Sequence, residues 1–156
     1  MSDGPEVFAS RAGGVLLPVA SLPGRFGTGD LGPGAEFLLD WCARAGLGWW
    51  QFLPVGPVGA GESPYATRSA FAGEPLFVSL ELLRDEGLLE ARDLRAPKEL
   101  SGGACDYAAA RAFKLPRLAL AWQRWLRKGG PKRAPWRRFR RESEDWLDDW
   151  LGEFEG

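Results

Sequence analysis

The sequence predicts an α/β fold in which a parallel strand–helix–strand unit is followed by a mainly helical segment. Two short apolar runs, at 15–17 and 49–53, flank a stretch of helical periodicity at 33–45. Parallel strands joined through a helix produce this order. From residue 80 onward, apolar residues recur at helical spacing instead. We therefore expect residues 1–78 to form the start of a barrel and residues 79–156 to form an inserted helical subdomain.

Punctuating residues place the first strand, the first loop and the first helix. The apolar run at 15–17 fits a short buried strand. Residues 18–32 are rich in glycine and proline and predict a loop. Pro33 lies where a first helical residue belongs, and Gly46 suits the end of a helix. An amphipathic helix is therefore expected at 33–45.

The second predicted strand is followed by a long loop, which we expect to line a binding pocket. The aromatic-rich run 49–53 ends at Pro54, which cannot donate to a sheet ladder. Glycine and proline dominate the first part of the loop at 54–75. Because the carboxyl ends of parallel strands meet at one sheet edge, we expect loops 18–32 and 54–75 to be neighbours and to form a binding site.

The second half of the chain is expected to be helical. Pro116 lies inside one of its periodic stretches and predicts a kink or a break there. The expected elements are a brief extended piece at 76–78, helices at 80–89 and 108–127, and a last helix from Pro135 through Trp150.

Composition excludes several classes of function. The chain has 156 residues, with 20 basic and 21 acidic side chains and no histidine. This balance creates no field that would attract nucleic acid or an anionic membrane. No apolar run approaches the ~20 residues that span a bilayer, and residues 1–5 do not resemble a signal peptide. Cys42 and Cys105 lack metal-ligand spacing and fit reduced, buried thiols. We expect a cytoplasmic protein with no metal and no nucleic-acid or membrane partner.

Two carboxylates and one tyrosine are candidate functional groups on the neighbouring loops. Asp30 and Glu62 fall one on each loop, and paired carboxylates about 5 Å apart perform retaining glycoside chemistry. Turn capping or solvation is the favoured interpretation of each. Tyr65 follows Pro64 and offers a flat apolar face with a polar tip, which suits a sugar ring. Plugging of the barrel rim explains Tyr65 equally well.

Two further motifs favour ordinary structural roles. The stretch 27–32 matches G-x-G-x-x-G, but it lies well past the strand and opens no helix, so dinucleotide binding is not expected. The basic run 132–141 contains aromatic residues, as nucleic-acid sites do. Acidic residues follow it, however, and the pairs Arg138–Glu142 and Arg141–Asp145 have the i,i+4 spacing of a salt-bridged helix face.

Five blocks in a fixed order resemble the opening of amylomaltase, the 4-alpha-glucanotransferase family also called disproportionating enzyme. Weaker similarity continues at 80–83, 106–107 and 146–149. The five blocks are Arg11-Ala-Gly-Gly-Val-Leu-Leu17, Ser21-Leu-Pro-Gly-Arg-Phe-Gly-Thr-Gly-Asp-Leu-Gly32, Trp50-Gln-Phe-Leu-Pro-Val-Gly-Pro57, Ser63-Pro-Tyr65 and Ser69-Ala-Phe-Ala-Gly73.

The resemblance implies a (β/α)8 barrel with inserted subdomains and the transfer of an α-1,4-glucan segment to a glucan or glucose acceptor. The reaction passes through a covalent glycosyl-enzyme and needs no cofactor. The resemblance assigns Ser63 and Tyr65 to the subsite of the transferred sugar, and Asp30 to the same rim. It places the catalytic carboxylates on later strands, so no catalytic residue is expected in this chain. A barrel needs about 250 residues, so the remaining strands are expected from further C-terminal sequence.

The chain also departs from the family pattern. Each departure removes a polar or aromatic contact near the expected sugar site. The departures are Pro18-Val19-Ala20-Ser21 for His-Pro-Thr-Ser, Ala60-Gly61-Glu62 for Tyr-Gly-Asp, Ala66 for Gln, and Glu74 for Asn.

Two alternative functions stay open at this point. One is a non-catalytic glucan-binding module that binds maltooligosaccharides. The other is a helical interaction module, in which a partner packs on Trp122, Trp125, Trp146 and Trp150.

Overall fold

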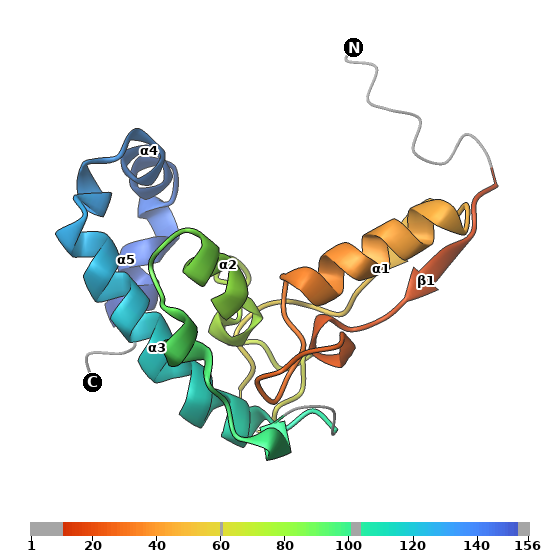
Figure 1. The fold of residues 1–156 in the computed structure, drawn as a ribbon. Helices are drawn as coiled ribbons and strands as arrows, with labels where there is room; N and C mark the ends of the chain where they lie inside the picture. Colours follow the sequence, from red (N-terminus) through yellow and green to blue (C-terminus); the bar gives the residue numbers. More distant parts are fainter. Residues whose placement is uncertain (1–10, 60, 101–103, 153–156) are drawn as a thin grey trace, which may run out of the picture.

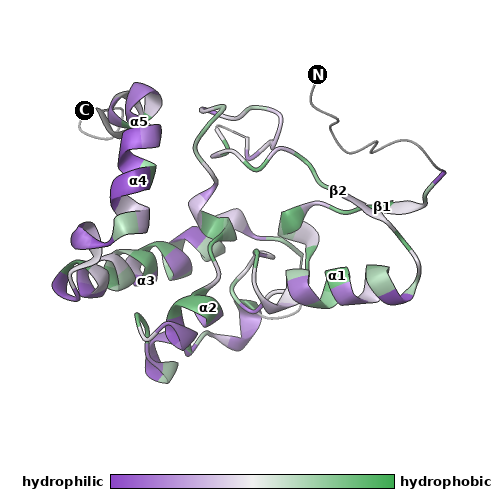
Figure 2. Cartoon of the chain, turned by 90° about the horizontal axis from the view of Figure 1, so that it is seen from above, coloured by the Kyte–Doolittle hydropathy of each residue, from purple (hydrophilic) through white to green (hydrophobic). Residues whose placement is uncertain are grey.

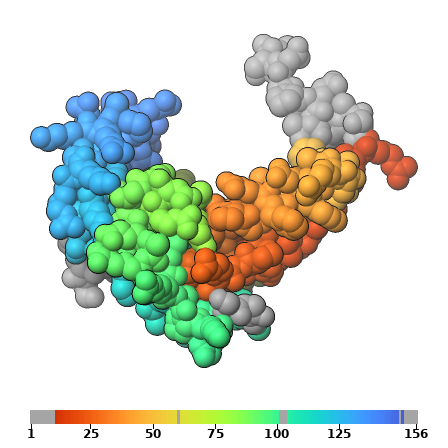
Figure 3. Space-filling view, in the orientation of Figure 1, coloured from red at the N-terminus to blue at the C-terminus, as the bar shows by residue number. Residues whose placement is uncertain are grey.

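The computed structural model describes residues 11–59, 61–100 and 104–152. The chain forms two arms with α2 between them (Figure 1), and Figure 3 shows the concave edge that the arms enclose. The strands are β1 (Gly14–Leu16) and β2 (Trp49–Gln51). The α-helices are α1 (Pro33–Arg44), α2 (Leu80–Asp85), α3 (Tyr107–Arg127), α4 (Ala134–Glu142) and α5 (Glu144–Gly152).

The two strands pair in parallel, as the strand–helix–strand order predicts. Gly14 lies opposite Trp49, and a Cβ at Gly14 would approach the Trp49 carbonyl oxygen to 2.9 Å, so this register requires glycine. The backbone N–H of Leu17 donates to the carbonyl of Gln51 at 3.0 Å, which continues the pairing past β1. Strand β1 is shifted by one residue from the predicted run at 15–17. Strand β2 begins at Trp49 as predicted but is shorter than the run at 49–53.

Helix α1 begins and ends where the sequence predicts. Pro33 is its first residue, and Gly46 follows it with a φ of +69°, in the left-handed region that favours glycine. The arm built from β1, α1 and β2 keeps much of its apolar surface open. Large side chains on this arm are 43–62% exposed, namely Leu16, Phe37, Leu39, Trp41, Trp49 and Phe52. A two-stranded sheet with one helix cannot cover these side chains.

The buried side chains form two clusters. The smaller one contains Val19, Leu22, Ala35 and Phe77 and lies between the first loop, α1 and the chain before α2. The larger one gathers side chains from α2, α3 and the segments between them, and its members are Phe26, Leu80, Leu88, Leu89, Leu94, Phe113 and Ala121. Phe26 comes from the first loop and stacks on Phe113 with ring centroids 5.3 Å apart. The first loop is therefore fixed in the core of the helical arm.

Three predictions for the helical half need correction. Residues 76–78 are not an extended piece, because Pro75–Phe77 form a 3-10 turn capped by the side chain of Glu74. The helix predicted at 80–89 ends at Asp85, and Gly87 follows with a φ of +70°. Helix α3 runs through Pro116 without the predicted break, and a kink there stays a prediction.

The last predicted helix is two helices. The chain turns at Ser143, and α4 ends there while α5 begins at Glu144. The backbone N–H of Ser143 donates to the Phe139 carbonyl at 2.9 Å, and the Ser143 carbonyl accepts from Leu147 at 2.9 Å. The apolar stripe continues across the turn, so its periodicity gives no sign of the break. Figure 2 shows that α4 is almost entirely hydrophilic.

Candidate functional site

The first loop, residues 18–32, is held by close backbone contacts. The backbone N–H of Gly29 donates to the carbonyl of Ala20 at 2.9 Å. A Cβ at Gly29 would overlap the carbonyl oxygen of Val19, so only glycine fits there. The hydroxyl of Thr28 donates to the carbonyl of Gly29 at 3.3 Å. These contacts hold the backbone so that Asp30, which follows Gly29, is buried.

Asp30 forms a buried ion pair with Lys114 of α3. The Lys114 ammonium donates to Asp30 Oδ2 at 2.7 Å and to the carbonyl of Leu76 at 2.6 Å. The Lys114 side chain is 0% exposed and that of Asp30 is 8% exposed. Burial raises the pKa of Asp30 and lowers the pKa of Lys114, because the loss of hydration outweighs the attraction between the two charges. One cation thus joins the end of the first loop to the chain just after the second loop.

The second loop, residues 54–75, is closed by the carboxylate of Glu74. This buried side chain accepts from the backbone N–H of Val58 at 3.0 Å and from that of Leu76 at 3.2 Å. Val58 also forms an antiparallel bridge with Thr67. The base of the loop is therefore ordered, although it contains no regular strand.

The tip of the second loop carries Ser63 and Tyr65. Glu62 precedes them with a φ of 56°, the left-handed region that a residue with a Cβ rarely adopts. Ser63 Oγ accepts from the backbone N–H of Tyr65 at 3.3 Å, and the Ser63 carbonyl accepts from Ala66 at 3.0 Å. The Tyr65 side chain is 74% exposed. The turn thus presents the tyrosine ring to solvent, so Tyr65 does not plug a rim in this structure.

A second cation of α3 holds Glu62. Arg111 Nη1 lies 3.1 Å from Glu62 Oε1, and the Arg111 guanidinium lies 5.7 Å from the ring centroid of Tyr107. Burial raises the pKa of Tyr107. The nearby Cys105 is exposed and not buried as predicted, whereas Cys42 is buried. Helix α3 therefore fixes the strained residue directly before Ser63.

The predicted proximity of the two loops is confirmed at their bases. Val55 of the second loop packs against the cluster that contains Val19 and Leu22 of the first. The backbone N–H of Leu31 donates to the carbonyl of Phe77 at 3.0 Å. Both loops also contact the first half of α3, which supports the whole site.

Asp30 and Glu62 do not act as one carboxylate pair. Each has its own cation, and the two cations, Lys114 and Arg111, lie three residues apart on α3. The predicted solvation is wrong for Asp30, which is buried, whereas Glu62 is partly exposed, and the sequence predicted neither cation. Ala60, one of the family departures, lies outside the described residues.

The sequence reasoning missed Lys114 and Arg111, and it noted Glu74 only as a departure from the family. Lys114 follows Phe113 and precedes Leu115, but Arg111 and Arg117 lie three residues away on either side, so the local pattern looks like an ordinary charged helix face and hides the buried ion pair. Glu74 lies directly before Pro75, and an acidic residue before proline is a capping signal. That signal does not name the distant partner.

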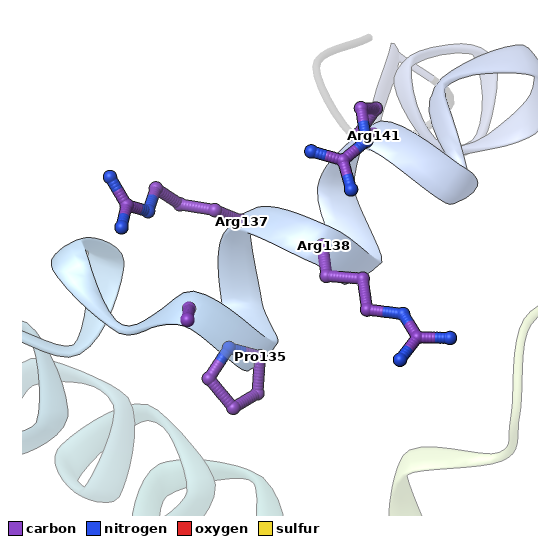
Figure 4. A pocket seen from close by; sticks show the side chains of 5 residues that line it. Pro135, Arg137, Arg138 and Arg141 are labelled. Atoms are coloured by element: carbon purple, nitrogen blue, oxygen red, sulfur yellow. The ribbon is translucent and has the colours of Figure 1, made fainter.

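The arginines of α4 do not converge on a ligand. A hollow of about 610 Å³ is lined by Ala134, Pro135, Arg137, Arg138 and Arg141. In Figure 4 the guanidinium groups of the three arginines point in different directions. The predicted pair of Arg138 and Glu142 is confirmed at 2.8 Å. The predicted Arg141–Asp145 pair is not found among the described ion pairs, because α4 ends before Asp145.

The tryptophans of the helical arm contact other aromatic rings of this chain. Trp122 stacks on Trp125 with centroids 4.8 Å apart, and both meet Trp136 edge-on at 5.6 and 5.2 Å. These rings stabilise the junction of α3 and α4, which leaves less support for a partner-binding role. Among the described residues, no group of three metal-ligating side chains could hold an ion. No described helix has the length and apolarity needed to cross a membrane.

Comparisons with known proteins agree on one family. The family model described as 4-alpha-glucanotransferase matches residues 17–152. The 4-alpha-glucanotransferase of Thermus thermophilus is 39% identical over 141 residues, which are 90% of this chain and 27% of that protein. The chloroplastic/amyloplastic 4-alpha-glucanotransferase of Solanum tuberosum is 38% identical over 145 residues, covering 89% and 25%.

A solved structure has the same local fold. The amylomaltase from Streptococcus agalactiae in complex with acarbose superposes with a TM-score of 0.70 at 30% identity, covering 94% of this chain and 27% of that one. The chain thus spans about a quarter of the length of the curated relatives that it matches.

Proposed function

The chain belongs to the 4-alpha-glucanotransferase family, and we propose that it supplies sugar-binding loops to an enzyme that transfers α-1,4-glucan segments. In this proposal β1, α1 and β2 begin a (β/α)8 barrel, and residues 79–156 form an inserted helical subdomain. The parallel pairing of β1 with β2 supports the first part. The open apolar surface of α1 and of the strands supports it as well, because further barrel strands and helices would cover that surface.

The observation that carries the proposal is the presentation of Tyr65. The ring is 74% exposed, and it lies on a turn that Glu62, Arg111 and Glu74 hold in place. Its flat face fits the apolar C–H face of a glucose unit, and its hydroxyl can pair with the sugar edge. A pre-ordered loop also loses little conformational entropy on binding.

Ser63 and Asp30 have distinct proposed roles at this rim. The Ser63 hydroxyl accepts from the Tyr65 backbone, which leaves its own proton for a sugar oxygen. The Asp30 carboxylate forms an ion pair with Lys114. Its proposed role is therefore to hold the first loop in position rather than to contact the sugar. The substrates of the proposal are α-1,4-glucans and maltooligosaccharides.

The bond-breaking carboxylates of the proposal lie outside this chain. Asp30, Glu62 and Glu74 are the acidic groups of the described site, and each has a cation or backbone N–H as its partner. A carboxylate in a fixed ion pair is a poor nucleophile and a poor acid. We expect no turnover from the 156 residues alone. The cytoplasmic location inferred from the sequence stays a prediction.

Two measurements test the proposal. Titration with maltotriose, followed by tryptophan fluorescence, should give a saturable signal that Tyr65→Ala abolishes and Tyr65→Phe largely keeps. An equal signal from Tyr65→Ala would remove Tyr65 from the sugar site. Disproportionation of maltotriose should be absent with the 156-residue chain, and robust turnover would show that the catalytic carboxylates are present after all.

A further inference from the structure

A second exposed ring lies on the same loop as Tyr65. Phe71 is 71% exposed, although phenylalanine has no polar atom to interact with water. Its other face rests on Trp146 of α5, with ring centroids 5.8 Å apart and planes inclined by 18°. The ring is thus backed on one side and open on the other. This is the arrangement of a stacking platform.

The backbone around Phe71 is fixed by hydroxyl groups. Ser69 Oγ accepts from the N–H of Phe71 at 3.2 Å and from that of Ala72 at 3.0 Å. The Thr67 hydroxyl donates to the carbonyl of Ser69 at 2.8 Å. These hydrogen bonds order the backbone of the turn that carries the Phe71 ring. The contacts hold the ring in one place, so that a ligand meets a surface that is already formed.

The backing ring is itself held by the turn between α4 and α5. Because the chain turns at Ser143, Trp146 meets the edge of Phe139 with centroids 6.3 Å apart and planes at 77°. Edge-to-face and offset-stacked contacts are the favourable geometries for aromatic rings. Trp146 is therefore supported from α4 while it supports Phe71.

We propose that Phe71, backed by Trp146, is a second stacking platform that binds glucose units of a longer α-1,4-glucan. The proposal rests on the proposed function because it takes an α-1,4-glucan as the ligand, but the platform itself does not require that Tyr65 binds a glucose unit. Two exposed rings six residues apart on one ordered loop can contact successive parts of an extended substrate. Beside the ring, the Ser69 hydroxyl accepts from two backbone N–H groups and keeps its own proton for a hydroxyl edge of the ligand.

The alternative role of Phe71 is to fasten α5 to the loop. That role needs apolar contact but not a planar open face. Phe71→Leu keeps the apolar bulk and removes the plane, whereas Phe71→Tyr keeps the plane. Binding of maltotriose and of maltoheptaose by the full chain, measured by calorimetry, separates the two roles.

The platform predicts an effect that depends on glucan length. Phe71→Leu should weaken maltoheptaose binding about two- to tenfold, as expected for one lost ring contact, and should change maltotriose binding less. Phe71→Tyr and the matched backing variant Trp146→Phe should stay within about twofold of the wild type. Equal losses for both glucans, no loss for maltoheptaose, or no maltoheptaose binding by the wild-type chain would overturn the platform.

The outcome can be separated from that of the proposed function. Because Phe71 is largely exposed, Phe71→Leu should leave the urea midpoint unchanged, and this checks that the variant is folded. If Tyr65→Ala has no effect on maltotriose while Phe71→Leu still weakens maltoheptaose, the Tyr65 site fails and the platform remains. If only Tyr65→Ala weakens binding, the platform fails alone.

Discussion

Replacing Lys114 with methionine should destabilise the protein by about 3–5 kcal/mol, the usual cost of leaving one buried charge without its partner. The Lys114 side chain is fully buried, and its ammonium contacts both Asp30 at 2.7 Å and the Leu76 carbonyl at 2.6 Å. Methionine preserves most of the volume but supplies no charge and no donor. A loss of this size is a large share of the ~5–15 kcal/mol that stabilises a typical domain.

The double variant Asp30→Asn, Lys114→Met is the matched control. It removes both charges and keeps a side-chain oxygen that can accept from the Gly32 backbone N–H, as Asp30 does. It leaves the Leu76 carbonyl without its donor, which costs about 1–3 kcal/mol. The double variant should therefore be more stable than Lys114→Met. Urea unfolding followed by circular dichroism gives both values from the midpoint, provided that the slope m is unchanged. A single variant within about 1 kcal/mol of the wild type, or a double variant less stable than the single one, would refute this account of the ion pair.

The pH dependence of Lys114→Met gives a second check. Burial already raises the pKa of Asp30 above its ordinary value of 3.8, and removal of the neighbouring ammonium raises it further. A carboxyl with a raised folded pKa favours the folded state below the unfolded pKa, and this contribution is lost as the pH rises through the folded pKa. The stability gap between the wild type and Lys114→Met should therefore be smaller near pH 4 than at pH 7.

Three further predictions concern single residues of the loops and of the helical arm. Glu62→Gly should be more stable than Glu62→Ala by about 1 kcal/mol in urea unfolding, because both lose Arg111 but only glycine accepts the left-handed φ without strain. The pKa of Asp93 is lowered by the backbone N–H of Glu90 and by Arg124, so the stability lost in Asp93→Asn should be complete at pH 7 and should shrink as the pH falls below about 4. Gly29→Ala should lower stability by about 3 kcal/mol, since its Cβ overlaps a backbone carbonyl; a thermal melt equal to that of the wild type would contradict this.

Local signals account for the parts of the fold that the sequence predicts well. Pro33 and Gly46 mark the ends of α1 because each residue has a conformational preference that acts over one or two positions. The parallel pairing of β1 and β2 follows from the order of the elements and needs no distant information. The loop of proline and glycine leaves two interpretations of Tyr65 open, a plug of the rim and an exposed ring, and the exposure of the side chain in the structure decides between them.

The errors arise where a distant contact or a weak signal decides the structure. Periodicity runs unbroken from Trp136 to Trp150, so it cannot reveal the turn at Ser143; a serine followed by two acidic residues is the only local sign of a helix start there. The partner of Asp30 lies 84 residues away on α3. No spacing rule predicts such a pair, because it depends on the packing of the whole chain.

Helix α3 links the two halves of the chain at the candidate site. Its Arg111 holds Glu62 beside the tyrosine turn, and its Lys114 holds Asp30 at the end of the first loop. These two side chains lie one turn apart, so a rigid helix fixes the position of one loop relative to the other. The helical half therefore helps to position the loop on which Tyr65 is presented. Any change that shifts α3 should alter sugar binding before it alters the strands.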